Sequence, residues 1–211
     1  MPEHEISYTV TKSYSTLNTC TKKTKNIWFV CHGLGYLSRY FIKNFHHLDQ
    51  EKNYIIAPQA PSKFYRDKAY TKVGACWLTK DHTQLEMENI LTYFNALYQK
   101  EIEPFPNKRV IILGYSQGVS VAMRWLAKSK ISCNDLIIHS GGIPNELKPE
   151  DFESFEFTPH LVYGLKDEYI NEERVILEKE KAKTLFGNKT IVHPFDGGHE
   201  VNHAFLKSFD N

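Results

Sequence analysis

The chain has 211 residues, 41 % hydrophobic and 24 % charged, which is the size and composition of one globular domain with a substantial core. A net charge of +1 argues against nucleic acid as a partner, and no apolar run approaches the length of a membrane span. The first residues lack a secretory signal, and the four cysteines are scattered without a C-x-x-C pair, so we expect a cytoplasmic protein with reduced thiols.

The first part of the chain predicts an edge strand or hairpin, a buried strand and a helix. The edge strand or hairpin is expected within residues 1–25, because Glu5–Asn18 is rich in Thr, Tyr and Ser. Asn26–Cys31 is a continuous apolar run, typical of a strand buried on both faces. It leads into the loop His32–Gly35 (HGLG), whose N–H groups either face a ligand or form an ordinary turn. A helix is predicted over Leu37–Leu48.

The next stretch contains a strand, an irregular segment and a long helix. The strand is predicted over Asn53–Ala57 and is ended by Pro58 and Pro61. Ser62–Trp77 shows no regular pattern but holds several aromatic residues, so we expect a long loop. Its rings either line a substrate pocket or pack over the edge of the sheet. An amphipathic helix is predicted over Asp81–Lys100.

The segment from Arg109 to Lys128 carries the strongest functional signal. Val110–Leu113 predicts a short buried strand, and an amphipathic helix is predicted from about Gln117. Between them, GYSQG matches G-x-S-x-G, in which the central Ser116 lies on a strained turn with its hydroxyl pushed outward. The flanking glycines let strand and helix pass closely, and the helix N-terminus offers N–H groups to an oxyanion. A serine that merely caps the helix is the alternative, and the strand–turn–helix context favours the nucleophile.

The rest of the chain continues to alternate strands and helices. Strands are predicted over Asn134–His139, Pro159–Tyr163 and Lys189–His193, with a helix over Asn171–Leu185 and a last short helix to about Phe209. This alternation predicts a single α/β domain over residues 1–211, with a mostly parallel central sheet and helices on both faces. In such sheets, ligands bind at the carboxyl ends of the strands.

A serine nucleophile needs a base within hydrogen-bond reach, and the base needs an anion that holds its tautomer. His199 is the best base, because it lies in a Gly-Gly-His loop after the last predicted strand. Asp167 is the best anion, because it follows the preceding strand, although Glu168 and Asp196 compete with it. The order Ser116, Asp167, His199 is the chain order of the α/β-hydrolases.

These segments resemble the carboxylesterase/phospholipase family of α/β-hydrolases, which includes acyl-protein thioesterases and small bacterial esterases. The resemblance covers roughly residues 27–205, and the HGLG loop and the GYSQG turn are its most specific parts. It implies a serine hydrolase that cleaves a carboxylic ester or thioester without a cofactor. The residues it implies are the nucleophile Ser116, its partners Asp167 and His199, and the oxyanion-hole N–H groups of Leu34 and Gln117.

The chain departs from the family at three places near these motifs. Tyr36–Leu37 stands where the family has Asp and a small residue, Ile170–Asn171 where it commonly has Val-Pro, and Val119 where a second glycine often follows the serine turn. These departures argue against assuming that lipidated proteins are the target. We expect a small acyl ester or thioester, with Tyr36 and Trp77 as candidate substrate-binding residues, and the oligomeric state, including a homodimer, stays open.

Two other functions compete with this interpretation. His199–His203 reads HEVNH and matches H-E-x-x-H, which on a helix places two imidazoles on one face to bind zinc. The metzincin extension would need glycine and histidine where the chain has Leu206 and Phe209, so we expect no metal. A catalytically inactive hydrolase fold used as a binding protein is the second alternative, and the intact set of three residues argues against it.

Overall fold

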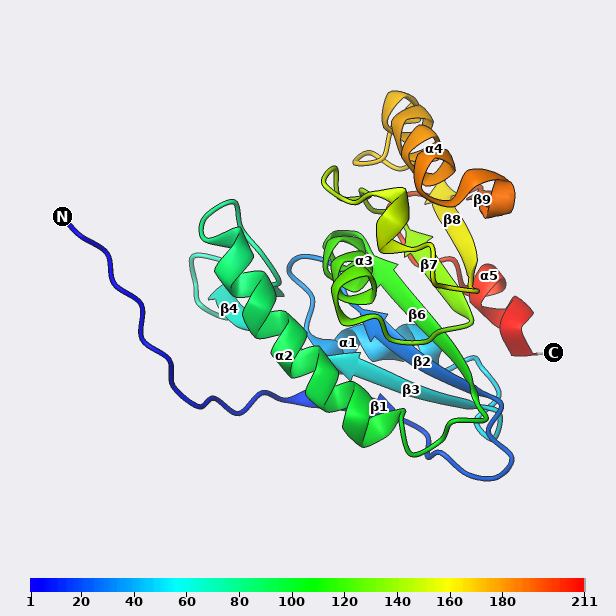
Figure 1. Ribbon diagram of the computed structural model, residues 1–211, viewed down its shortest axis with the longest axis horizontal. Helices are drawn as coiled ribbons and strands as arrows, with labels where there is room; N and C mark the ends of the chain where they lie inside the picture. The colour runs from blue at the N-terminus through cyan, green and yellow to red at the C-terminus, as the bar shows by residue number, and fades with distance from the viewer. Residues whose placement is uncertain (211) are drawn as a thin grey trace.

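A seven-stranded sheet forms the centre of the computed structural model, which describes residues 1–210 (Figure 1). The strand order is β1-β3-β2-β6-β7-β8-β9; β1 runs antiparallel to β3, and the other neighbouring pairs are parallel. The strands are β1 Tyr14–Leu17, β2 Asn26–Cys31, β3 Asn53–Pro58, β6 Arg109–Tyr115, β7 Asp135–His139, β8 Thr158–Gly164 and β9 Ile191–Phe195. The α/β fold with a mostly parallel sheet, predicted from the alternation of strands and helices, is therefore confirmed.

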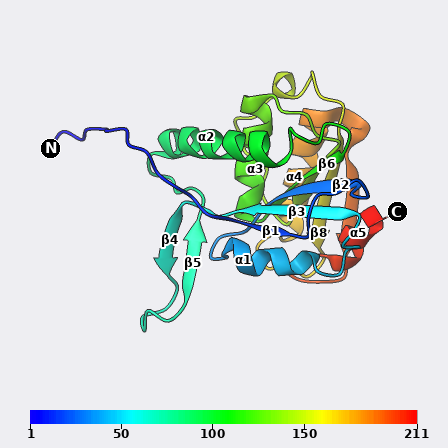
Figure 2. The same ribbon diagram turned by 90° about the horizontal axis from the view of Figure 1, so that it is seen from below.

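Helices cover both faces of this sheet, as Figure 2 shows edge-on. One face is covered by α2 (Thr83–Glu101), α3 (Gln117–Ser129) and α4 (Glu172–Phe186). The other face is covered by α1 (Ser38–Phe41) and α5 (His203–Lys207). Short 3-10 turns complete the chain: η1 Ile42–Phe45, η2 Pro149–Asp151, η3 Gly187–Lys189 and η4 Ser208–Asp210. No helix of residues 1–210 is long and apolar enough to cross a membrane.

The sheet has a hydrophobic core on each of its two faces, because successive side chains along the buried strands point to opposite faces. In β2, Phe29 packs against Phe94 and Trp125 on the side of α2 and α3. Its neighbour Trp28 points to the opposite face, against Phe45 and Phe209. Each such large apolar side chain contributes about 1.5–3 kcal/mol when it is fully buried. All six residues of β2 are buried, which explains why the strand reads as a continuous apolar run rather than an alternating one.

The segment expected to be an irregular loop is instead a β-hairpin. β4 (Ser62–Tyr65) pairs antiparallel with β5 (Val73–Cys76), and the hairpin projects from the main sheet in Figure 2. The turn is held by the Asp67 carboxylate, which accepts the backbone N–H groups of Thr71 and Lys72. The prediction failed because both strands are only four residues long and β4 is exposed throughout, so no pattern of burial marks them.

Several element boundaries also differ from the expected ones. In the N-terminal stretch the structure has a strand only at Tyr14–Leu17, and residues 1–13 form no helix or strand. The helix expected to reach Leu48 ends earlier, in the 3-10 turn at Phe45. The last strand begins at Ile191 instead of Lys189, because η3 extends to Lys189.

Candidate active site

The residues singled out by sequence come together at one edge of the sheet. This edge is formed by the carboxyl ends of neighbouring parallel strands, so segments distant in sequence meet there. The loop His32–Gly35 follows β2, Ser116 follows β6, Asp167 follows β8 and His199 follows β9.

Ser116 sits at the apex of the turn between β6 and α3, in a conformation that side-chain-bearing residues rarely adopt. Its φ is 53° and its ψ is −120°, a strained geometry that costs on the order of 1–3 kcal/mol. The flanking glycines make this turn sterically possible. A Cβ on Gly118 would lie 2.1 Å from the carbonyl oxygen of Cys31, and one on Gly114 would lie 2.4 Å from Cα of Val119.

A chain of two hydrogen bonds links Ser116, His199 and Asp167, which we call the triad. His199 Nε2 lies 3.0 Å from Ser116 Oγ, and His199 Nδ1 lies 2.8 Å from Asp167 Oδ2. The other carboxylate oxygen of Asp167 accepts the backbone N–H groups of Tyr169 and Ile170, at 2.8 and 3.0 Å. An acceptor at Nδ1 places the proton there and leaves Nε2 free to accept the serine proton.

The two competing acids lie outside this hydrogen-bonded chain. Asp196 forms an exposed ion pair with Lys166, at 2.6 Å, and its side chain is 76 % exposed. Glu168 is also exposed, whereas the Asp167 side chain is completely buried. Within residues 1–210, Asp167 is the only one of the three acids that forms a hydrogen bond with His199.

Two backbone N–H groups near Ser116 have no hydrogen-bond partner among residues 1–210. These are the backbone N–H groups of Leu34 and Gln117. The Gly33 carbonyl, in the same peptide as the Leu34 N–H, accepts His32 Nδ1–H at 2.8 Å. Because N–H and C=O point in opposite directions across a trans peptide, this bond turns the Leu34 N–H away from His32. The Ser116 carbonyl is held in the same way by Val119 N–H, at 3.1 Å.

Sequence and structural comparisons relate this chain to known proteins. The sequence model of the phospholipase/carboxylesterase family matches residues 13–211. The chain belongs to the phospholipase/carboxylesterase family. Acyl-protein thioesterase 2 from Zea mays, a solved structure, aligns with 95 % of this chain and 96 % of its own, at 14 % identity and a TM-score of 0.70.

Other solved structures share the fold of this family member at similarly low identity. Esterase PE8 aligns with 95 % of this chain and 98 % of its own, at 20 % identity and a TM-score of 0.70. A phospholipase/carboxylesterase from Dyadobacter fermentans covers 97 % of both chains, at 18 % identity and a TM-score of 0.66. The search of curated protein sequences finds no match.

The His199 imidazole of this family member contacts the rings of two tyrosines, which the sequence analysis did not single out. The ring of Tyr115 lies 5.3 Å from the imidazole and that of Tyr169 lies 4.8 Å from it. Tyr115 is buried and its hydroxyl donates to the His199 carbonyl at 2.8 Å, whereas Tyr169 is 68 % exposed. Both are adjacent to motif residues, Tyr115 within GYSQG and Tyr169 two positions after Asp167. That adjacency is the only sequence signal for them, because no spacing rule predicts a ring contact.

The two candidate substrate-binding residues lie in different environments. Tyr36 is 41 % exposed, and its ring lies edge-on to Tyr115 at 6.1 Å. Trp77 is 1 % exposed and packs against Phe94 and His32 in the core. Its indole therefore does not form the wall of an open pocket, because these two rings cover it.

The H-E-x-x-H interpretation requires a helical arrangement that the described residues do not have. Helix α5 begins at His203, so His199 lies before it. The two imidazoles also have different partners: His199 joins the triad, and His203 Nε2 lies 3.2 Å from Asn44 Oδ1. Within residues 1–210, no cluster of three or more His, Cys, Asp or Glu side chains is arranged to hold a metal ion.

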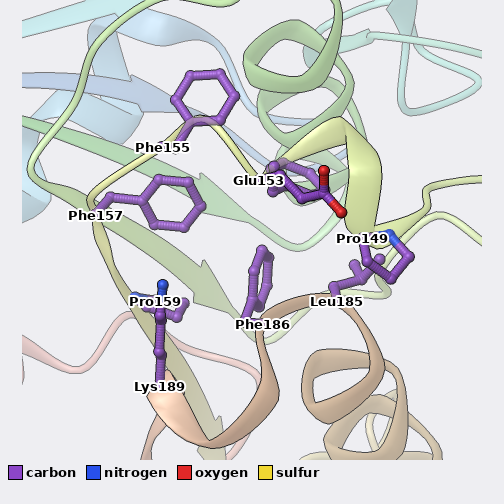
Figure 3. Close-up of a pocket in the computed structure, with 9 residues that line it drawn as sticks. Pro149, Glu153, Phe155, Phe157, Pro159, Leu185, Phe186 and Lys189 are labelled. Atoms are coloured by element: carbon purple, nitrogen blue, oxygen red, sulfur yellow. The ribbon is translucent and has the colours of Figure 1, made fainter.

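A separate hollow of about 280 Å³ lies near the C-terminus of α4 (Figure 3). Its walls include Phe155, Phe157 and Phe186, with Lys189 nearby. Pro159, another wall residue, lies at the start of β8, so the hollow is at the opposite end of this strand from Asp167. Its largest rings are mostly buried against one another, and we assign it no part in the site.

Two buried histidines near the triad make the stability of the protein sensitive to acid. Burial lowers the pKa of His32 from 6.5 to about 4 and that of His139 from 6.5 to about 3. Below pH 6.5 the unfolded chain therefore binds protons that the folded chain does not, and the free energy of unfolding falls. Between about pH 6 and pH 4.5 we expect each histidine to contribute a slope approaching ~1.4 kcal/mol per pH unit.

Urea unfolding at a series of pH values measures this effect. In His139→Gln, the slope of the unfolding free energy against pH should fall by the contribution of about one proton, or ~1.4 kcal/mol per pH unit, because one of the two titrating groups is removed. An unfolding free energy that stays constant from pH 6.5 to pH 4.5 in the wild type would contradict the prediction.

Proposed function

We propose that this chain is a serine hydrolase that cleaves carboxylic esters or thioesters through an acyl-enzyme on Ser116. The single observation that carries the proposal is the triad: contacts of 3.0 and 2.8 Å join a strained, half-buried serine to a histidine and a buried aspartate. Membership of the phospholipase/carboxylesterase family supports the hydrolase class. The maize acyl-protein thioesterase is a structural neighbour, which makes a thioester a second candidate bond.

In the first half of the reaction, Ser116 Oγ attacks the acyl carbon while His199 Nε2 takes the hydroxyl proton. The Asp167 carboxylate, 2.8 Å from Nδ1, stabilises the imidazolium that forms. The negative charge on the former carbonyl oxygen is held by the N–H groups of Leu34 and Gln117, which have no other partner among residues 1–210. The tetrahedral intermediate then collapses, and the imidazolium protonates the leaving alkoxide or thiolate.

In the second half, water hydrolyses the acyl-enzyme by the same groups. The water oxygen attacks the acyl carbon while His199 Nε2 removes a proton from the water, and the oxyanion of the tetrahedral intermediate again lies against the two N–H groups. Collapse returns the proton from His199 to Ser116 Oγ and releases a carboxylic acid. The protein is restored without a cofactor, since each step requires only proton transfer and acyl transfer.

Exposed apolar and aromatic side chains around the triad support a small acyl ester or thioester as the substrate. Leu34 is 55 % exposed and belongs to the loop that supplies one oxyanion N–H. Tyr36 and Tyr169 are 41 % and 68 % exposed, and their rings contact Tyr115 and His199. We propose these three side chains as the substrate-facing surface, because Tyr36 and Tyr169 combine exposure with ring contacts beside the triad and Leu34 is exposed in the loop next to Ser116.

The proposal is tested by activity and by covalent labelling of the wild-type protein. We expect hydrolysis of a p-nitrophenyl ester from a series of graded acyl lengths. A fluorophosphonate probe should modify the chain once, and peptide mass mapping should place the adduct on Ser116. A folded protein that neither reacts with the probe nor hydrolyses any ester or thioester of the series would instead support the inactive binding protein.

A further inference from the structure

We propose that the chain leaving the β4–β5 hairpin, residues 74–78, is a bridge that holds both loops of the oxyanion hole in place. In this bridge the side chains of Gln117 and Trp77 act as positioning residues. The inference rests on the proposed function, because it concerns the two N–H groups that would bind the oxyanion. It goes beyond it by assigning a role to side chains that do not touch the reacting atoms.

The Gln117 side chain ties the serine turn to the bridge. Its Oε1 accepts the backbone N–H of Trp77 at 2.9 Å, and its Nε2 donates to the Leu78 carbonyl at 2.8 Å. The same Nε2 lies 3.3 Å from Cys76 Sγ. These contacts occupy both ends of the amide. The residue whose backbone N–H is one oxyanion donor is therefore anchored by its side chain to a segment 40 residues away along the chain.

The bridge also holds the loop that supplies the other donor. The backbone N–H of Gly35 donates to the Ala75 carbonyl at 2.8 Å. On the other side of Leu34, the indole Nε1–H of Trp77 donates to the His32 carbonyl at 2.7 Å. The His32–Gly33 and Leu34–Gly35 peptide groups thus have partners in the bridge, and they flank the Gly33–Leu34 peptide that carries the Leu34 N–H.

Close packing leaves little freedom between the bridge and this loop. A Cβ on Gly74 would lie 2.8 Å from Cα and from the carbonyl oxygen of Gly35. The Trp77 ring is 1 % exposed, and it lies 4.9 Å from the His32 ring. Buried hydrogen bonds of this kind are costly to leave unmade, so the loop has one favoured position relative to the bridge.

These contacts have a catalytic consequence, because an oxyanion hole stabilises the transition state only when its donors already point to the position of the oxyanion. Loss of one donor in a known serine hydrolase costs about 10²–10³ in kcat. A displacement of about 1 Å at a reacting centre can cost about 10²-fold. We therefore expect loss of the bridge contacts to reduce kcat by about 10- to 100-fold. KM should change little, because substrate-facing side chains are retained.

The test compares Trp77→Phe and Gln117→Met with a matched control, Trp125→Phe. Trp77→Phe removes the indole donor to His32, and Gln117→Met keeps the backbone N–H but loses both amide bonds. Trp125 is another fully buried tryptophan, and its indole donates to Asn95 Oδ1 at 2.8 Å, outside the bridge. Its substitution removes an equivalent buried donor without touching either oxyanion loop.

Three measurements separate positioning from general destabilisation. For one p-nitrophenyl ester, kcat should fall in both bridge variants and stay within about twofold of wild type in Trp125→Phe. The inhibition constant of a trifluoromethyl ketone, which forms an oxyanion adduct on serine, should rise in proportion to the loss of kcat/KM. The pH dependence of kcat/KM should keep its wild-type midpoint, because His199 and Asp167 are unchanged. If Gln117→Met fails to fold, Gln117→Glu takes its place, since it retains the acceptor for Trp77 N–H and loses the donor to Leu78.

The outcomes distinguish failure of the bridge from failure of the proposed function. Bridge variants that keep wild-type kcat and ketone affinity, or that lose no more activity than Trp125→Phe, would overturn the bridge alone. A change confined to KM would also overturn it, because the side chains would then act on substrate binding. A wild type without turnover or probe labelling would overturn the proposed function, and the bridge with it.

Discussion

Replacing Ser116 with alanine is expected to lower kcat for ester hydrolysis by about 10⁶-fold, or roughly 8 kcal/mol of activation free energy. The hydroxyl is the only group at the apex of the turn that could form the acyl-enzyme, and its loss leaves the His199 imidazole without a proton to take. The measurement is kcat on a p-nitrophenyl ester, together with fluorophosphonate labelling, which should disappear.

Ser140 offers a matched control for this substitution. It follows β7, the strand next to β6, has a φ of 47° and lies with its Oγ 3.1 Å from His139 Nδ1. It thus resembles Ser116 in backbone geometry and in having a histidine partner, but it is only 1 % exposed. Ser140→Ala should retain kcat within about tenfold, under roughly 1.4 kcal/mol. Labelling that survives in Ser116→Ala and vanishes in Ser140→Ala would show that the nucleophile is misassigned.

Asp167→Asn is expected to reduce kcat/KM by about 10⁴-fold while the protein stays folded. An amide has no charge to stabilise the imidazolium, and its NH₂ group can select the tautomer in which Nε2 carries the proton and cannot accept one from Ser116. The fold should persist because the remaining amide oxygen can still accept the N–H groups of Tyr169 and Ile170. The measurement is kcat/KM on one ester, with thermal melts recorded for the same sample.

Two neighbouring acids serve as controls for Asp167. Asp196→Asn removes an exposed ion pair with Lys166, and such pairs contribute about 0–1 kcal/mol to stability. Glu168→Gln changes an exposed side chain beside Asp167. Each should change kcat/KM by less than about tenfold. If Asp196→Asn showed the large loss of kcat/KM and Asp167→Asn remained near wild type, the assignment of Asp167 as the acid of the triad would be wrong.

Local patterns in the sequence were sufficient for most of the sheet and for the serine turn. A continuous apolar run predicts a strand buried on both faces wherever it lies in the fold, and β2 and β3 are of this kind. The steric demand on Gly114 and Gly118 is equally local, since a turn that places Ser116 at φ 53° brings strand and helix too close for any side chain. Chain order and position after a strand were enough to propose Asp167 and His199.

Tertiary structure decided the features that depend on contacts between segments far apart in the sequence. Trp77 looks like a pocket residue in an aromatic-rich stretch, yet its ring is buried against Phe94 of α2 and the His32 ring, and its two N–H groups donate to Gln117 and His32. Likewise, HEVNH becomes a zinc motif only if one helix contains both histidines, and α5 begins at His203. Periodicity and backbone sterics depend on residues that are close together in the sequence. The partner of a side chain depends on hydrogen bonds and packing between segments that lie tens of residues apart. Such contacts leave no pattern in a single sequence, which is why Ser116, Asp167 and His199 could be proposed and the contacts of Trp77 and the Gln117 side chain with the neighbouring loops could not.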